Sequence, residues 1–150
     1  MLIEEKFQVG APIAKAWAFI LDPGKVGPCM PGFVSATEVE PDVWDAVMKV
    51  KVGIISLKMH ARTKIVEKDP PKHMKAAGEG HDTLKAGTFH QETVMDLVPI
   101  SENVTEIRYS MSIRIVGKLA TFGEKIMRAT AGKMGTEVAA NIRKAIEASV

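Results

Sequence analysis

The sequence has one cysteine, few aromatic residues and little excess charge, and each shortage excludes a class of protein. A single cysteine cannot form a disulfide within the chain, so a disulfide-stapled secreted fold is excluded. Twenty Lys and Arg against 18 Asp and Glu leave a net charge of +2, which is too balanced for a protein that binds nucleic-acid phosphates. No apolar run reaches the ~18 residues that a membrane-spanning helix needs.

The first ten residues, MLIEEKFQVG, are acidic where a signal peptide is basic. We therefore expect a cytoplasmic protein. The 150 residues suit one domain, 1–150, which is large enough to bury a core without a disulfide or a metal.

Methionine is the abundant residue, with nine copies against five Phe, two Trp and one Tyr. Its flexible side chain adapts to irregular space, so a Met-rich interior is a candidate lining for a shape-tolerant pocket. A core that merely uses Met is the alternative interpretation.

Proline and glycine divide the chain into elements that the hydrophobic period identifies. A strand over 2–9 precedes a helix that opens at Ala11-Pro12, and one more helical turn fits between Lys25 and Gly32. Period-2 alternation predicts six further strands, over 33–40, 43–52, 55–68, 72–80, 86–98 and 105–116. Residues 119–148 contain no proline and predict one long C-terminal helix.

Six consecutive strands with short turns pair mostly antiparallel, so we predict an α+β fold built on one sheet. One face of this sheet is charged and faces water. The other face is apolar, and the long helix is the element that can cover it.

Methionines from separate strands share the apolar face with alanines and a glycine. Small inward residues under a long helix favour an internal cavity, and a filled core is the alternative. Tyr109, with Gln91 or Thr93, is a candidate hydrogen-bond partner for a carbonyl group of a ligand. The predicted cavity residues are Met30, Phe33, Met48, Val50, Met59, Ala61, Met74, Ala76, Tyr109, Met111, Ile113, Phe122, Ile126, Met127, Thr130 and Met134.

No pattern in the sequence predicts catalysis or a metal site. The four histidines form no HxxxH or HExxH pair, and the segment 27–32 lacks the Lys-Ser/Thr of a phosphate-binding loop. The acidic and histidine residues of 78–82 are interpreted as a strand end and turn. Cys29 has no basic neighbour closer than Lys25 to lower its pKa, so it is interpreted as a packing residue. We therefore predict no catalytic residue, no metal and no cofactor.

Several segments match one known family in order along nearly the whole chain. They are Phe7-Gln8-Val9, Ala11-Pro12, Ala16-Trp17, Leu21-Asp22-Pro23, Val26, Cys29-Met30-Pro31-Gly32, Val50-Lys51-Val52-Gly53, Asp69-Pro70-Pro71, Gly78-Glu79-Gly80, Tyr109 and Gly117-Lys118-Leu119-Ala120. Together these segments resemble the carbon monoxide dehydrogenase G-subunit family, which is part of the helix-grip superfamily of START-like and polyketide cyclase proteins.

The resemblance implies a helix-grip fold, with a seven-stranded antiparallel sheet wrapped around a long C-terminal helix and two short helices after the first strand. It also implies a non-catalytic accessory of a molybdenum-containing dehydrogenase that carries a quinone or another lipid-like molecule in a hydrophobic cavity. Family members often end in a membrane-associating tail, whereas this sequence stops at Ser149-Val150. We therefore expect transient contact with a membrane surface rather than stable attachment.

Three functions are compatible with this interpretation. The leading one is a carrier of an apolar small molecule, which enters beside the 25–33 loop and the start of the long helix. The second is a cyclase- or hydrolase-type enzyme that uses the same cavity. The third is an assembly factor that docks on a molybdenum hydroxylase through the charged face of the sheet.

Overall fold

The computed structural model describes residues 1–83 and 87–149, apart from the side chains of Leu119 and Phe122. Within these residues one strand, two short helices, six strands and a long helix follow one another, as the sequence predicts. The strands are β1 (Leu2–Val9), β2 (Phe33–Glu40), β3 (Val43–Val52), β4 (Ile55–Asp69), β5 (His73–Asp82), β6 (Thr88–Ser101) and β7 (Val104–Val116). The α-helices are α1 (Ile13–Ile20), α2 (Pro23–Val26) and α3 (Gly123–Ala148), with 3₁₀ turns η1 (Gly27–Cys29) and η2 (Lys118–Phe122).

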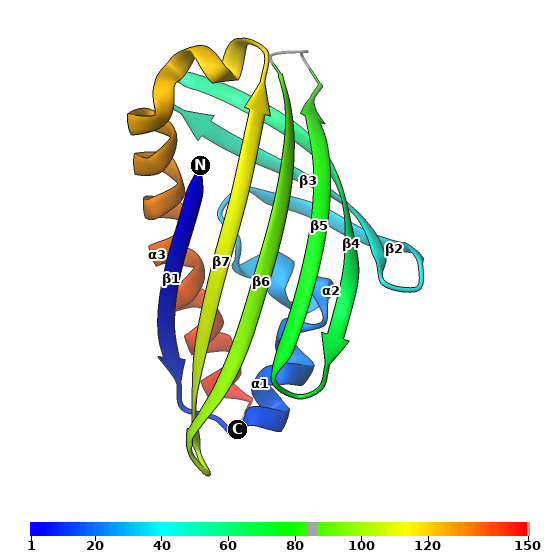
Figure 1. The fold of residues 1–150 in the computed structure, drawn as a ribbon, viewed down its shortest axis with the longest axis vertical. Helices are drawn as coiled ribbons and strands as arrows, with labels where there is room; N and C mark the ends of the chain where they lie inside the picture. The colour runs from blue at the N-terminus through cyan, green and yellow to red at the C-terminus, as the bar shows by residue number, and fades with distance from the viewer. Residues whose placement is uncertain (84–86, 150) are drawn as a thin grey trace.

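All the described strands form one antiparallel sheet in the order β1-β7-β6-β5-β4-β3-β2. The sheet curves strongly, and α3 runs along its β1 side while α1 and α2 lie at the end where the C-terminus is (Figure 1). The predicted seven-stranded antiparallel sheet with a long C-terminal helix is therefore confirmed.

Proline sets the start of the first helix. Pro12 occupies the N-cap of α1, where its missing N–H costs no hydrogen bond, and Ala16, Trp17 and Ile20 form the buried face of the helix. Asp22 then caps α2, because its Oδ1 accepts a hydrogen bond from the Gly24 N–H at 2.9 Å. The predicted helical turn before the second strand corresponds to α2 and η1.

Three element boundaries differ from the prediction. The long helix begins at Gly123 rather than at residue 119, because Gly123 has a φ of +80° and separates the 3₁₀ turn η2 from α3. Strand β6 continues through Pro99 to Ser101, where a register shift accommodates the proline that cannot donate to the ladder. Residues 78–82 belong to β5 and are not a turn.

Side-chain hydrogen bonds hold α3 against the free edge of the sheet. Arg128 donates to the Leu2 carbonyl at 2.8 Å, and Arg143 donates to the Gln8 carbonyl at 2.9 Å, so two turns of the helix are tied to β1. On its other side, the Asn141 Nδ2 donates to the Cys29 carbonyl at 2.9 Å. Hydrogen bonds on two sides of α3 thus fix its position against the sheet.

The buried hydrophobic residues fall into two clusters rather than one continuous core. The α1 cluster joins α1, the C-terminal part of α3 and the nearby strand ends; its buried members are Val9, Ala11, Ala16, Trp17, Ile20, Cys29, Met74, Ala76, Leu97, Ile107, Ile142 and Ile146. The hairpin cluster lies where β3 turns into β4; it comprises buried Val52, Leu57 and Met59, with Val50, Phe89, Ile115 and Met127 packed against them. The inner face of the sheet between the two clusters belongs to neither of them.

Candidate functional site

The inner face of the sheet stays half-buried along its middle. In the strand register, Ala46 pairs with Ala61. Thr63 pairs with Gly78, which in turn pairs with Gln91. The members of each such row lie on the same face of the sheet. We call this region the inner belt; its residues are Trp44, Ala46, Met48, Ala61, Thr63, Gly78, Gln91, Thr93, Met111 and Ile113, and every one of them is partly exposed. In a packed core, inward residues in the middle of a sheet are the most buried ones, so their exposure indicates that the belt is not filled.

Helix α3 covers the belt without packing into it. Among the strands, α3 lies closest to β1 and β3, near the two opposite sides of the curved sheet. Its buried residues are Ile142 and Ile146, both in the last two turns, whereas Ile126 near its start is 42% exposed. Between Met127, which packs against the hairpin cluster, and Val138, which packs against the α1 cluster, the residues of the helix are partly or fully exposed.

A pocket of about 880 Å³ opens between the β3–β4 hairpin and α3. Its apolar wall combines Val50 and Leu57 from the inner face of the hairpin with Ala129 and Met134 from the helix. Thr130, Lys133 and Glu137 of the helix supply polar groups, and Pro31-Gly32 forms the side next to η1. This volume is within the ~300–1,000 Å³ typical of small-molecule sites.

A smaller hollow of about 290 Å³ lies on the opposite side of α3, against β1 and β7. Phe7, Tyr109 and Gly135 are among its lining residues. A Cβ at Gly135 would lie 2.9 Å from the Tyr109 hydroxyl, so the absence of a side chain there allows the phenol to reach the helix. The helix consequently has an opening on both of its sides.

The inner belt contains a few uncharged polar groups among apolar ones. Thr63, Gln91 and Thr93 point inward, which resolves the phase of the β6 residues that the sequence left uncertain. Tyr109 is one row further along, and burial raises the pKa of its hydroxyl, with the nearby Glu5 carboxylate adding to the effect. These groups can orient a carbonyl or hydroxyl of a ligand while the rest of the belt contacts hydrocarbon.

The structure distributes the predicted cavity residues over several environments. Four lie on the inner belt: Met48, Ala61, Met111 and Ile113. Three line the larger pocket, namely Val50, Thr130 and Met134. Tyr109 lines the smaller hollow.

The remaining predicted residues lie outside these spaces. Met59 and Met127 belong to the hairpin cluster, and Met74 and Ala76 belong to the α1 cluster. Met30 ends η1 and is half-buried, while the Phe33 ring packs on Gly27. Ile126 is on the exposed side of α3. The side chain of Phe122 is outside the described part of the chain.

Several residues of the site are absent from the predicted cavity residues, among them Trp44 and Lys133. Trp44 lies on the inner belt, two residues before Ala46 on the same strand, and the period-2 pattern that identified Ala46 and Met48 was the signal that could have found it. Lys133 lines the larger pocket, one residue before Met134. Its contribution depends on the rotation of α3, which a sequence pattern does not specify.

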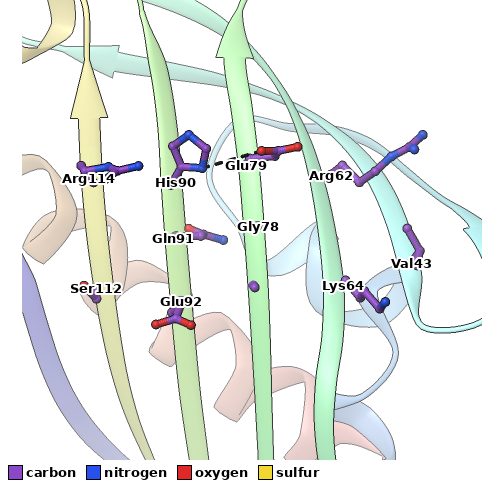
Figure 2. A pocket seen from close by; sticks show the side chains of 11 residues that line it. Val43, Arg62, Lys64, Gly78, Glu79, His90, Gln91, Glu92, Ser112 and Arg114 are labelled. Atoms are coloured by element: carbon purple, nitrogen blue, oxygen red, sulfur yellow. Dashed lines mark ion pairs between the residues drawn. The ribbon is translucent and has the colours of Figure 1, made fainter.

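The outer face of the sheet carries the charged residues, as predicted. A shallow hollow of about 650 Å³ lies on it, lined by Arg62, Lys64, Glu79, His90 and Arg114 among others (Figure 2). Arg62 donates to Asp45 at 2.7 and 3.0 Å, and this hydrogen-bonded pair lowers the pKa of the Asp45 carboxyl. The His90 and Glu79 side chains approach within 3.7 Å. The hollow is shallow and open, and its charged side chains suit contact with another charged surface.

The cysteine thiol and the stacked histidine rings lie away from the belt, whereas Lys133 and Glu137 line the larger pocket. Cys29 is buried in the α1 cluster, and burial raises the pKa of its thiol, which disfavours the reactive thiolate. The His60 and His81 rings stack on the outer face with centroids 6.0 Å apart. Within residues 1–83 and 87–149, no three His, Cys, Asp or Glu side chains gather closely enough to hold a metal ion. No helix in the same ranges is both long and apolar enough to cross a membrane.

Comparison with known proteins gives one family match. The family model described as CoxG, the G subunit of carbon monoxide dehydrogenase, matches residues 6–147. No curated protein matches the chain.

Three solved structures illustrate the fold similarity. A conserved protein from Geobacillus kaustophilus superimposes with a TM-score of 0.91 at 23% identity, covering 99% of this chain and 97% of that one. A START superfamily protein from Mycobacterium smegmatis gives 0.77 at 11% identity, covering 99% of both chains. The Zhui aromatase/cyclase from Streptomyces sp. R1128 gives 0.71 at 13% identity, covering 98% and 93%. At these identities the three structures show a common helix-grip fold.

Proposed function

The chain belongs to the carbon monoxide dehydrogenase G-subunit family, CoxG, and from this premise we propose that it is a non-catalytic carrier of an apolar small molecule. The cargo is a quinone or another lipid-like molecule. The carrier acts as an accessory of a molybdenum-containing enzyme of the carbon monoxide dehydrogenase type.

The single observation that carries this proposal is the unfilled inner belt between two packed clusters. Apolar side chains such as Met111 and Ile113 remain partly exposed although α3 lies over them. When a hydrocarbon displaces water from apolar surface under a covering helix, the free energy of the complex is lowered. A ligand that covers about 300 Å² of this surface gains roughly 7 kcal/mol at ~25 cal/mol per Å², from which the entropic cost of binding is subtracted.

The lining of the belt supports a cargo with one or two carbonyl or hydroxyl groups. Methionine side chains adapt to variable hydrocarbon shapes. Thr93 lies two residues from Gln91 on β6, Tyr109 is opposite Met95 two residues further along, and all three offer uncharged donors. A quinone ring satisfies both requirements, because its faces are apolar and its carbonyl oxygens accept hydrogen bonds.

The arrangement of titratable groups favours binding over catalysis. The aromatase/cyclase similarity shows that this fold can host an enzyme. However, the inner belt as described carries no His, Cys, Asp, Glu, Lys or Arg side chain. An enzyme that moves protons on a bound substrate needs such a group within hydrogen-bond reach of the reacting atom.

The proposed place of action is the cytoplasmic side of a membrane, where an apolar cargo is stored and where a dehydrogenase can pass electrons to it. The charged outer face with Arg62, Glu79 and His90 is the surface that we assign to the partner enzyme. Its polar, ion-paired character is typical of a transient contact.

The test is to purify the protein under native conditions, extract it with organic solvent and measure the intact mass before and after extraction. We expect a mass excess that disappears on extraction and that corresponds to an isoprenoid quinone or a lipid. The extracted protein should then bind a short-chain quinone with quenching of the Trp44 fluorescence. A protein that carries no cargo and binds neither a quinone nor an apolar dye contradicts the proposal.

A further inference from the structure

The tip of the β3–β4 hairpin projects an isoleucine fully into solvent. Ile54 is 98% exposed, and its neighbour Ile55 is 38% exposed. Val52 pairs with Ile55, so Gly53 and Ile54 form a two-residue loop. Gly53 has a φ of +61°, and a Cβ built on it meets no atom within 4 Å, which confirms that the tip stands clear of the rest of the molecule.

An isoleucine is an unusual choice for this position. Two-residue hairpin loops favour Asn, Asp, Gly and Ser, which tolerate the turn conformations or hydrogen-bond to the backbone. Gly53 takes the positive φ of this loop, so the turn tolerates isoleucine at position 54 but gains no hydrogen bond from its apolar side chain. In the isolated protein Ile54 contributes no burial to the core, so its side chain is available to a partner.

Lysines surround this apolar tip without matching acids. Register places Lys49 directly opposite Lys58, an arrangement of like charges that weakens strand pairing, and Lys51 follows on the same face. In the described parts of the chain none of these three ammonium groups has an ion-pair partner. Further along the sheet the cations Arg62, Lys68, Lys72, Lys75 and Arg108 each lie within 3.7 Å of a carboxylate.

The hairpin tip is continuous with the larger pocket. Lys51, Gly53 and Ser56 line the pocket of about 880 Å³ together with Ala129 and Met134 of α3. Behind the tip, Val52 and Leu57 pack against Met127 in the hairpin cluster. The β3–β4 hairpin and the first turns of α3 lie at the same end of the molecule (Figure 1), and residues of both line the pocket.

We propose that this end of the molecule docks on an anionic lipid bilayer, with Ile54 inserted among the acyl chains and Lys49, Lys51 and Lys58 against the acidic headgroups. Lys51 and Lys58 lie three and four residues from Ile54, about 10–13 Å along the strands at ~3.3 Å per residue. Their long side chains reach back toward the tip, which brings the ammonium groups to headgroup level while Ile54 enters the apolar layer.

A bilayer fits this surface better than a protein does. Among the described residues of the hairpin tip, Ile54 is the one large side chain that is almost fully exposed, so the hairpin tip offers no extended complementary face for a protein partner. A bilayer needs none, since it accepts a single apolar side chain anywhere and supplies diffuse negative charge to flexible lysines. The assignment of cargo exchange to this end rests on the proposed carrier function, because the pocket mouth then opens at the membrane surface that stores the cargo.

The experiment is flotation of the full-length protein with two kinds of vesicle, phosphatidylcholine alone and phosphatidylcholine mixed with phosphatidylserine. We expect binding to the mixed vesicles and little to the neutral ones. Ile54→Ser should weaken binding to the mixed vesicles at least tenfold. The triple variant K49Q/K51Q/K58Q should weaken it about 100-fold, at roughly fivefold for each lysine, and added salt should weaken wild-type binding in the same direction.

Two matched controls test whether the location matters. Ile100 is 51% exposed near the end of β6, at the opposite end of the sheet, so Ile100→Ser removes the same side chain elsewhere. The variant K68Q/K72Q/K75Q removes three charges around the β4–β5 turn, which is also at that opposite end. Both controls should bind the mixed vesicles as the wild type does.

A separate measurement distinguishes this proposal from the carrier function. All variants are titrated with Nile red in the absence of lipid, and Ile54→Ser, whose side chain is not among those lining the pocket, should bind it like the wild type. Wild-type protein that binds Nile red but floats with neither vesicle overturns the docking proposal, leaves the carrier function standing and assigns the tip to a protein partner. Controls that lose vesicle binding as strongly as the tip variants also overturn it. Vesicle binding without uptake of Nile red or quinone supports docking and contradicts the carrier function.

Discussion

Two alanines on the inner face of the sheet allow the unfilled belt to be tested by a single pair of substitutions. Ala61 of β4 lies on the inner belt and is partly exposed, whereas Ala76 of β5 is 7% exposed within the α1 cluster. Ala→Phe adds the same ring to both positions, and phenylalanine is well accommodated in strands. Only the space around each side chain differs.

The expected effects on stability follow from that difference. Overpacking of a filled core costs about 1–3 kcal/mol, and a domain of this size loses roughly 2–4 °C of melting temperature per kcal/mol. Ala76→Phe should therefore lower the melting temperature by ~2–12 °C. Ala61 is only partly buried beside Ala46, although the Phe89 ring covers the neighbouring Gly80, so the melting temperature of Ala61→Phe should stay within ~2 °C of the wild type.

The effect on binding should be the reverse. A ring at Ala61 occupies about 100 Å² of apolar surface that a ligand would otherwise cover, which is worth roughly 2.5 kcal/mol, or about a 70-fold loss of affinity. Differential scanning fluorimetry and quinone titration measure the two effects on the same samples. If Ala61→Phe is destabilised as much as Ala76→Phe and binds quinone normally, the inner face is a filled core and the reasoning is refuted.

Two further predictions concern stability. Hydrogen bonds to Asp96 at 2.8 Å and to Glu67 at 3.3 Å raise the pKa of His73 above its ordinary value of 6.5. The contribution of protonated His73 to the free energy of unfolding is therefore fully present below pH 6.5 and is lost as the pH rises through the raised pKa. Urea unfolding of the wild type should show this loss of stability with rising pH, and a His73→Gln variant that retains the same slope contradicts it. Gly32→Ala should lower the free energy of unfolding by more than ~1 kcal/mol in the same assay, because φ is +80° and a Cβ would overlap the Lys49 carbonyl oxygen. An unchanged unfolding midpoint would show that the loop relaxes at no cost.

Local pattern was sufficient to predict most of the fold. Alternation along the strands separated Met48 and Ala61 from the charged residues of the outer face, because successive strand residues point to opposite faces. Proline and glycine located the ends of the first helix. The boundary at Gly123 was missed, since glycine in a helical pattern does not by itself reveal a positive φ.

The sequence predicted the residue types that line the candidate site, but not which of the inward residues belong to it. Met59 and Met111 have the same residue type and the same inward phase, yet Met59 is buried in the hairpin cluster and Met111 lies on the open belt. Ala61 and Ala76 divide in the same way. The sequence records which way a side chain points, but not how far the covering helix lies from it.

The order of the elements, the antiparallel sheet, its apolar inner face and the family all follow from the sequence, since each depends on local period or on motifs read in order. Only the tertiary structure determines which parts of that inner face are packed and which are left open. This depends on the curvature of the sheet and on the attachment of α3 to the β1 edge by Arg128 and Arg143, contacts between residues more than 120 positions apart. Packing also brings the pocket beside the exposed Ile54, because no local pattern specifies the position of a hairpin tip relative to a distant helix.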